Sequence, residues 1–201
     1  MFIDIVHWPK NLEKEFLSVL NQLNQRIVCL ADENIKKPLY EEKEGIKIIH
    51  LPFNSKVNGL GIVELKEVEN LRDFLSGLNR KMLFGFESLP LKESVSSLHS
   101  GLNRVICNEM NKRENIYGLC ISQLIHSSNK AGMLSRIIQN LYLCKKYSVR
   151  VAVFTLASSP YDLRAEKEVR ALLNTLSSNQ RFARDAMKTI PKLIDVESFK
   201  Y

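Results

Sequence analysis

Short, nearly continuous apolar runs alternate along this chain with longer segments whose apolar residues recur at helical spacing. Strands that are apolar on both faces are typical of a parallel sheet buried between helices. Seven runs have this strand pattern: Phe2–Val6, Arg26–Leu30, Ile46–Leu51, Leu60–Leu65, Met82–Phe86, Tyr117–Ser122 and Val149–Thr155. Amphipathic helical segments lie between them, at Leu12–Leu23, Val68–Leu78, Leu102–Asn111 and Lys130–Tyr147. With right-handed crossovers, this alternation predicts an α/β fold, an irregular TIM-like βα-barrel of about seven strands.

The length of the chain favours one domain. Its 201 residues, 45% of them hydrophobic, suffice for one sizeable core, so we expect a single barrel-like domain over residues 1–201. The stretch "ADENIKKPLYEEKEG", residues 31–45, has the charge of a loop and makes an incomplete barrel the expectation. No run approaches the roughly 20 apolar residues of a membrane span, and the opening lacks the basic start of a signal peptide. A soluble, cytoplasmic protein without membrane contact is expected.

The four cysteines are widely spaced and form no C-x-x-C pair. Cys29, Cys107, Cys120 and Cys144 all fall inside apolar patterns, where a thiol behaves as a small hydrophobe. We therefore expect them to pack in the core rather than to bind zinc or to carry redox chemistry.

Positive charge is concentrated in the second half of the chain. Residues 1–100 carry 13 Lys and Arg against 14 Asp and Glu, and residues 101–201 carry 16 against 8. Such an asymmetry is typical of a surface that binds a polyanion such as nucleic acid. The alternative is a charged face that simply meets solvent.

The stretch "SSPYDLRA", residues 158–165, follows the last strand-like run. Ser159 is suited to cap a helix, Pro160 to its first position and Asp162 to its first turn. A helix that starts after a strand, with Arg164 nearby, is suited to hold a phosphate group. A capped helix with a surface arginine is the alternative interpretation.

The helical segment Lys130–Tyr147 has two distinct stripes. A core stripe is expected from Met133, Leu134, Ile137, Ile138, Leu141 and Cys144. A second flank gathers Arg136, Gln139, Asn140, Leu143 and Tyr147, which is either a partner surface or an ordinary surface with scattered apolar residues.

Catalytic groups in a βα-barrel lie at the carboxyl ends of the strands. Those positions hold His7, His50, Glu64, Glu87, Ser122, His126, Thr155, Ser158 and Ser159. Histidine and carboxylate ligands suit zinc or manganese, but no H-x-H or H-E-x-x-H spacing is present. There is also no G-x-S-x-G elbow and no phosphate-binding P-loop. We therefore expect neither a metal site nor a catalytic residue on this chain.

Several motifs of the second half resemble the archaeal ribonuclease P protein component 3 family, relatives of the thirty-kilodalton subunit of the eukaryotic enzyme. They are "SGLN" at 100–103, "HSS" at 126–128, "LSRIIQNLYLCKKYSVRVAVFT" at 134–155, "SSPYDLRA" at 158–165 and "ARDAM" at 183–187. In residues 1–99 the resemblance rests on the strand–helix rhythm and on Asp4. The chain departs from the family pattern at Glu166, where a proline is usual, and at His99, where a charged residue is usual.

The resemblance implies a barrel related to the polymerase-and-histidinol-phosphatase (PHP) metallohydrolases, without their metal-binding histidines. It implies a subunit of the ribonucleoprotein that removes the 5′ leader from precursor tRNA, with the active site and its Mg²⁺ on the RNA. The protein itself would hold no cofactor. Its partners would be the ribonuclease P RNA and the small RRM-like component 2, in a two-plus-two assembly, with precursor tRNA met indirectly.

Two sets of contact residues follow from this interpretation. The expected RNA contacts are Arg104, Lys130, Arg136, Lys145, Lys146, Arg164, Arg170 and Arg184, with Arg164 foremost. Helical RNA is recognised mainly through shape and phosphates, so a basic surface without stacking aromatics is adequate. The expected contacts with the protein partner are Gln139, Asn140, Leu143 and Tyr147. A metal-dependent phosphoesterase on the same barrel, and a general RNA-binding protein, remain as alternatives.

Overall fold

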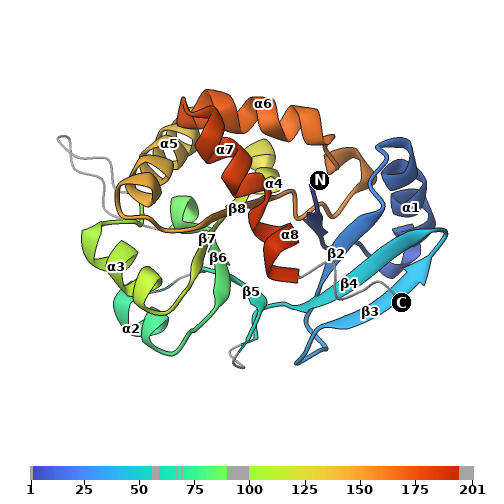
Figure 1. The fold of residues 1–201 in the computed structure, drawn as a ribbon, viewed down its shortest axis with the longest axis horizontal. Helices are drawn as coiled ribbons and strands as arrows, with labels where there is room; N and C mark the ends of the chain where they lie inside the picture. Colours follow the sequence, from blue (N-terminus) through green and yellow to red (C-terminus); the bar gives the residue numbers. More distant parts are fainter. Residues whose placement is uncertain (1, 56–58, 67, 69, 90–99, 195–201) are drawn as a thin grey trace.

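The computed structural model describes residues 2–55, 59–66, 68, 70–89 and 100–194. The described strands form two four-stranded sheets, with most of the helices packed on their outer faces (Figure 1). The strands are β1 (Asp4–Val6), β2 (Ile27–Asp32), β3 (Leu39–Lys43), β4 (Ile46–Pro52), β5 (Gly61–Glu64), β6 (Lys81–Phe84), β7 (Ile116–Cys120) and β8 (Val151–Phe154).

Parallel pairing dominates both sheets. The first sheet has the order β1-β2-β4-β3, in which β1, β2 and β4 are parallel and β3 runs antiparallel to β4. The second has the order β5-β6-β7-β8 and is parallel throughout. The predicted α/β fold with mainly parallel, TIM-like strand pairing is confirmed.

Single parallel bridges connect the two sheets at both of their adjoining edges. Val6 of β1 is bridged to Ala157 after β8, with hydrogen bonds from the His7 N–H to the Ala157 carbonyl (2.9 Å) and from the Leu156 N–H to the Ile5 carbonyl (2.7 Å). Phe53 after β4 is bridged to Ile62 of β5. The seven parallel strands therefore follow one another in the order β1-β2-β4-β5-β6-β7-β8.

Eight α-helices lie in the described residues: α1 (Glu13–Gln22), α2 (Leu71–Ser76), α3 (Arg104–Lys112), α4 (Ile121–His126), α5 (Lys130–Lys146), α6 (Glu166–Ser177), α7 (Gln180–Met187) and α8 (Thr189–Ile194). Three short 3₁₀ helices accompany them: η1 (Lys10–Leu12), η2 (Phe86–Ser88) and η3 (Pro160–Asp162). None of the described helices is long and apolar enough to cross a membrane.

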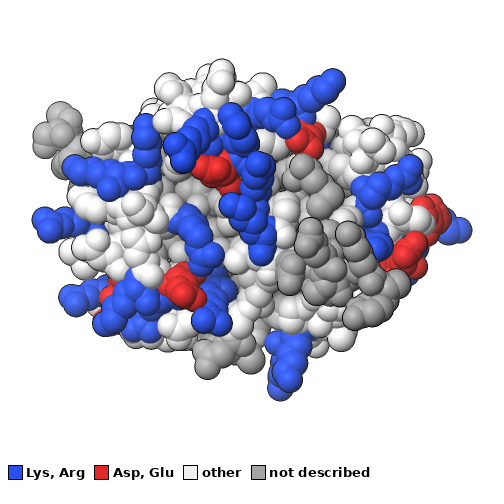
Figure 2. Space-filling model, viewed as in Figure 1, with Lys and Arg blue, Asp and Glu red and all other residues white. Residues whose placement is uncertain are grey.

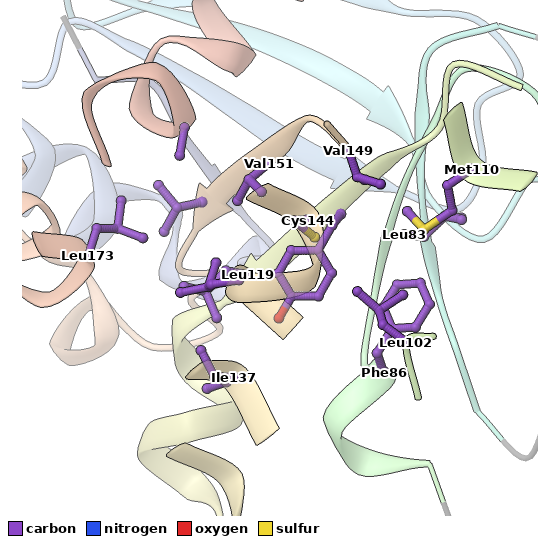
Figure 3. Close-up of a cluster of buried hydrophobic side chains, with 14 of the residues drawn as sticks. Leu83, Phe86, Leu102, Met110, Leu119, Ile137, Cys144, Val149, Val151 and Leu173 are labelled. Carbon is purple, nitrogen blue, oxygen red and sulfur yellow. The ribbon is translucent and has the colours of Figure 1, made fainter. Parts of the chain in front are cut away.

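Alternate residues of each parallel strand enter different apolar clusters, as a strand's two-residue period requires. An inner cluster takes Ile5 from β1, Cys29 from β2 and Leu51 from β4, with further members from β5 to β8 and from α8. An outer cluster between the second sheet and α3, α5, α6 and α7 takes the intervening residues (Figure 3). A third cluster lies between the first sheet and α1. All four cysteines are buried, as the sequence predicts.

All seven predicted strands are present, but several local predictions are wrong. The segment 31–45, expected to be loop, contains strand β3, which pairs antiparallel along β4 from Ile46 to His50. The strand expected to continue to Ser122 ends at Cys120, where α4 begins at the next residue. The helix expected at Ser159 is only the three-residue η3, and α6 begins at Glu166.

One buried carboxylate joins the first strand to the last. Asp4 is fully buried, and its Oδ1 accepts hydrogen bonds from the N–H groups of Ile5 (2.8 Å) and Thr155 (2.7 Å). Its Oδ2 accepts the Thr155 hydroxyl at 2.7 Å. Burial raises the pKa of Asp4 to about 6, because the loss of hydration outweighs these three donors. The first and the last parallel strand are thus held together by side-chain as well as main-chain hydrogen bonds.

We predict that Asp4→Asn removes a specific part of the pH dependence of stability. The pKa of Asp4 is higher in the folded chain than the ordinary 3.8, so folding favours its protonated form, and this contribution to stability is lost as pH rises from about 4 to about 6. An asparagine keeps the Oδ1 acceptor and does not titrate. The free energy of unfolding of the wild type minus that of the variant should fall by up to about 3 kcal/mol between pH 4 and pH 7 in urea titrations. Parallel pH profiles for the two proteins would contradict the prediction.

Candidate nucleic-acid interface

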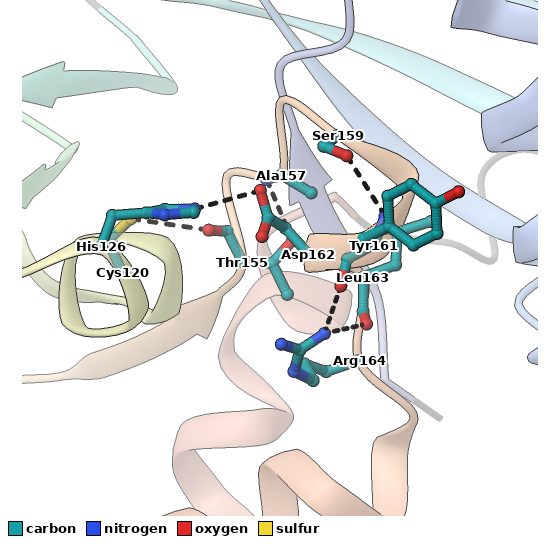
Figure 4. Close-up of polar contacts among 9 residues, drawn as sticks. All are labelled: Cys120, His126, Thr155, Ala157, Ser159, Tyr161, Asp162, Leu163 and Arg164. Atoms are coloured by element: carbon teal, nitrogen blue, oxygen red, sulfur yellow. Dashed lines mark hydrogen bonds and ion pairs between the residues drawn. The ribbon is translucent and has the colours of Figure 1, made fainter.

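Several polar groups at the carboxyl ends of the strands contact one another. Glu64, the last residue of β5, accepts from Gln123 of α4 at 3.2 Å and pairs with Lys66 at 2.7 Å. His126, at the end of α4, lies 3.2 Å from Asp162 (Figure 4). Within the described part of the chain, no group of three His, Cys, Asp or Glu residues is placed to hold a metal ion. These strand ends therefore offer hydrogen-bonded structural pairs rather than a ligand cage.

The connection from β8 to α6 is built around Arg164. Its Nη1 donates to the carbonyl oxygens of Tyr161 and Leu163, both at 2.7 Å (Figure 4). The Arg164 carbonyl in turn accepts from Gln25 at 2.9 Å. The helix start expected at Ser159 is only the three-residue η3, and the N-terminus of α6 lies instead at Glu166, two residues after Arg164. Arg164 is half-buried and holds the turn; its contact with RNA remains a prediction.

Asn140 and Arg136 belong to a buried polar network rather than to a free flank of α5. The Asn140 amide donates to Glu87 Oε1 at 2.5 Å and to the Ser100 carbonyl at 2.9 Å. Arg136 donates to the Glu87 carbonyl at 2.7 Å, and the Tyr117 hydroxyl donates to Glu87 Oε1. Burial raises the pKa of Glu87 against the opposing effect of these donors. The prediction of Asn140 as a surface contact is wrong, because its side chain is fully buried.

The exposed apolar residues of α5 are also different from those expected. Ile138 and Tyr142, one helical turn apart, are 48% and 61% exposed. Ile138 had been expected in the core stripe. Leu143 and Tyr147, expected as exposed anchors, are half-buried and pack against the outer cluster. Gln139 is half-buried as well.

A concentration of exposed positive charge surrounds α7. We call this the α7 surface, and it consists of Lys145, Arg150, Arg170, Arg181, Arg184, Lys188 and Lys192, all exposed. Figure 2 shows Lys and Arg side chains gathered over the part of the molecule where α5, α6, α7 and α8 lie, with fewer acidic side chains among them. Between residues 166 and 194 there are six Lys and Arg against three Asp and Glu. The expected RNA contacts Lys145, Arg170 and Arg184 are brought together here.

Most cations of the α7 surface have no ion-pair partner among the described residues, unlike several cations elsewhere. Arg80 and Arg113 pair with Glu114 and Glu109, and Lys43 pairs with Glu13. By contrast, the side chains of Lys145, Arg181, Arg184, Lys188 and Lys192 form no ion pair with another described residue. Within the surface, Arg170 pairs with Glu166, and Arg150 donates to the Glu114 carbonyl at 2.9 Å. The remaining cations keep their full hydrogen-bonding capacity for a ligand.

Other expected RNA contacts lie away from this surface. Arg104 is the first residue of α3 and Lys130 the first of α5, and both are exposed. Lys130 and Lys146 stand at opposite ends of α5, about 24 Å apart along its axis. The eight expected cations therefore do not form a single patch.

Sequence reasoning missed four members of the α7 surface. Arg150, Arg181, Lys188 and Lys192 were not among the expected contacts. Arg181, Arg184 and Lys188 stand at spacings of three and four residues, which places their side chains on one side of α7 and its C-cap residue. Lys192 belongs to the separate helix α8. The spacing of the first three was the available signal, and it becomes informative only once α7 is known to be helical.

The fold and this surface define the class of protein: a TIM-like α/β protein with a strongly basic helical face. Ribonuclease P protein component 3 of Methanosarcina mazei is 35% identical in sequence over 92% of this chain and 82% of its own length. The protein of the same name from Methanocaldococcus jannaschii is 24% identical over 99% of this chain and 92% of its own length. The chain belongs to the family of archaeal ribonuclease P protein component 3, although it matches no family model.

A solved structure supports the fold. A chain from the cryo-EM structure of archaeal ribonuclease P with mature tRNA superimposes with a TM-score of 0.65 at 18% sequence identity. The match covers 98% of this chain and 91% of that one. The similarity therefore extends over both sheets and the helices of the α7 surface.

We predict that Asn140→Ala destabilises the fold strongly. It removes two donors at once, leaving the Ser100 carbonyl and the buried Glu87 carboxylate without them, at a cost of about 2–4 kcal/mol. Gln139→Ala, at the neighbouring position, is the control, because the Gln139 Oε1 has no hydrogen-bond partner. It should change the free energy of unfolding by less than about 0.5 kcal/mol in urea titrations. Equal effects of the two substitutions would show that the network does not stabilise α5.

Proposed function

We propose that this chain is a protein subunit of ribonuclease P and supports the catalytic RNA in removing the 5′ leader from precursor tRNA. The observation that carries the proposal is the sequence identity with component 3 of Methanosarcina mazei over nearly the whole chain. The basic α7 surface is consistent with it, because affinity for nucleic acid comes largely from neutralising phosphates. The protein acts in the cytoplasm and has no catalytic residue of its own in this proposal.

Hydrolysis is assigned to the RNA. In the proposed enzyme the RNA carries the active site and its Mg²⁺, while the protein holds no cofactor. The Glu64 carboxylate accepts from Gln123 and the His126 imidazole contacts Asp162, which is consistent with structural roles for both side chains. The protein then raises turnover by stabilising the folded RNA electrostatically.

We assign the main RNA contact to the α7 surface, which contains Lys145, Arg170 and Arg184. Lys188, Lys192 and Arg181 join them because they are exposed and unpaired among the described residues. Lys146, Arg104 and Lys130 are proposed as secondary contacts from other elements. Arg136 and Arg164 are proposed to act mainly by positioning, because their guanidinium groups already hold backbone carbonyls.

The protein partner is proposed to be the small RRM-like component 2, in a two-plus-two assembly. The exposed side of α5 is the proposed contact, with Ile138 and Tyr142 as apolar anchors. The half-buried Gln139, Leu143 and Tyr147 border it. Large apolar and aromatic residues supply most of the binding energy in such interfaces.

We further propose that the two sheets constitute one irregular barrel-like domain related to the PHP metallohydrolases. The two bridges between the sheets and the inner cluster fed by seven parallel strands support this proposal.

We predict that the α7 surface is needed for stimulation of the RNA. Precursor-tRNA cleavage would be measured after reconstitution with ribonuclease P RNA and component 2. The pair Arg184→Ala and Lys188→Ala should reduce stimulation at least tenfold at moderate salt, because two phosphate contacts are lost. The pair Lys10→Ala and Lys14→Ala, on the distant η1 and α1, is the charge-matched control and should leave it unchanged. Unchanged cleavage by the pair would remove α7 from the RNA interface.

The same reconstitution tests Arg164 and the enzymatic alternative. Arg164→Ala should lower thermal stability, because two carbonyl contacts of η3 are lost. Its stimulation should recover once the temperature is kept well below the unfolding midpoint. Stoichiometric metal in the purified chain together with phosphatase activity in the absence of RNA would instead support a metal-dependent phosphoesterase.

A further inference from the structure

Helix α7 forms a ridge between two hollows. One, the α6–α7 hollow, has a volume of about 370 Å³ and is lined by Glu166, Arg170, Asn174, Gln180, Arg184, Met187 and Lys188. The other, the α7–β8 hollow, has a volume of about 350 Å³ and is lined by Cys144, Lys145, residues 148–151, Phe182, Asp185, Ala186, Thr189, Lys192 and Leu193. Residues of α7 that line the two hollows project from opposite sides of the helix.

Both hollows carry the same excess of positive charge. The α6–α7 hollow has Arg170, Arg184 and Lys188 against Glu166. The α7–β8 hollow has Lys145, Arg150 and Lys192 against Asp185. Each is therefore suited to an anion with a charge of one or two, such as a phosphodiester group of a nucleic acid backbone.

The buried side of the ridge gives it a fixed position. Ala183, Ala186 and Met187 of α7 and Ile190 of α8 are buried against the rest of the molecule, on the side opposite Arg181 and Lys188. The small alanine side chains allow the helix backbone to lie close to its neighbours. The two sets of cations are consequently held at a set separation across α7 rather than on mobile loops.

No exposed aromatic side chain lines either hollow among the described residues. Phe182 packs against the outer cluster, and the exposed tyrosines 40, 142 and 161 lie on other elements. Proteins that bind single-stranded nucleic acid usually stack its bases on aromatic side chains, whereas double-helical RNA is bound through phosphates and shape. The surface therefore favours a double helix over a single strand.

We propose that α7 lies along a groove of an RNA double helix, with phosphates of one strand in the α6–α7 hollow and phosphates of the other strand in the α7–β8 hollow. This inference rests on the proposed function. It adds that the bound RNA is double-helical and that each hollow contacts a different strand. Arg181 and the crest of α7 face the groove itself, between the two phosphate rows.

The test uses the full-length chain and a 5′-labelled RNA duplex of about 16 base pairs, with one of its strands alone as the single-stranded probe. Lys188→Gln removes one positive charge from the α6–α7 hollow, and Lys192→Gln removes one from the α7–β8 hollow. Lys14→Gln, on α1, is the matched control. The logarithm of the binding constant falls linearly with the logarithm of the salt concentration. Each of the two hollow substitutions should reduce the magnitude of that slope by roughly 0.9, the value for one lost phosphate contact, and the two reductions should add. The control should leave the slope unchanged.

Phosphate-ethylation interference, read on each labelled strand, locates the contacts. Lys188→Gln should abolish interference on one strand and Lys192→Gln on the other. Loss on the same strand for both variants, or single-stranded RNA bound as tightly as the duplex, would overturn the proposal.

Reconstituted precursor-tRNA cleavage separates this inference from the proposed function. If the wild-type chain stimulates cleavage but the strand assignment fails, only the two-strand arrangement is lost. If the wild-type chain fails to stimulate the RNA at all, the proposed function is lost with it. Matching thermal unfolding midpoints for the three variants would confirm that each effect reflects binding rather than folding.

Discussion

The contact between Asp4 and Thr155 is the constraint on which the arrangement of the basic surface depends. It joins the first parallel strand to the last through a carboxylate that is completely removed from water. A buried charge of this kind is tolerated only because three donors surround it, and its raised pKa measures how incompletely they replace hydration. Beside it, the two main-chain hydrogen bonds of the Val6–Ala157 bridge fix the path of the chain as it leaves β8. The turn at η3, the start of α6 and the position of α7 all follow from that path.

The strands could be predicted because burial on both faces leaves an unmistakable apolar run. Strand β3 could not, because residues 39–43 are only half-buried or exposed and are held mainly by main-chain pairing to β4. The helix expected at Ser159 was wrong for a related reason. Ser159 and Pro160 are equally suited to start a 3₁₀ turn, and the extended backbone at Leu163 and Ala165 then delays α6. The helix-start propensities of Ser159 and Pro160 identified the turn correctly but did not show that it ends after one turn.

The sequence-based choice of RNA-binding arginines considered only their charge and not whether their guanidinium groups already form internal hydrogen bonds. Arg136 and Arg164 lie within the motifs that resemble the family, yet their guanidinium groups are used to hold backbone carbonyls. Asn140 is likewise an internal donor. A sequence does not show whether a side chain's donors are already engaged. Sequence reasoning therefore overestimates motif residues as ligand contacts and underestimates cations such as Lys188, which is unpaired within the described part of the chain.

Most of the motifs that resemble the family can be explained by their structural roles in turns, helix caps and internal contacts. In "SGLN", Gly101 has a φ of 82°, a Cβ there would lie 2.6 Å from the Phe86 carbonyl oxygen, and Asn103 caps α3. In "SSPYDLRA", Asp162 holds His126 of "HSS". The motif "ARDAM" is different, because it combines the buried Ala183 and Ala186 with the exposed Arg184, which has no ion-pair partner among the described residues. Packing and charge are joined there within one helical turn: the alanines let α7 lie close to the structure beneath it, and that close packing fixes where its cations stand. A helix with larger side chains at those positions would be displaced outward and would carry the same charge at the wrong distance from α6 and β8.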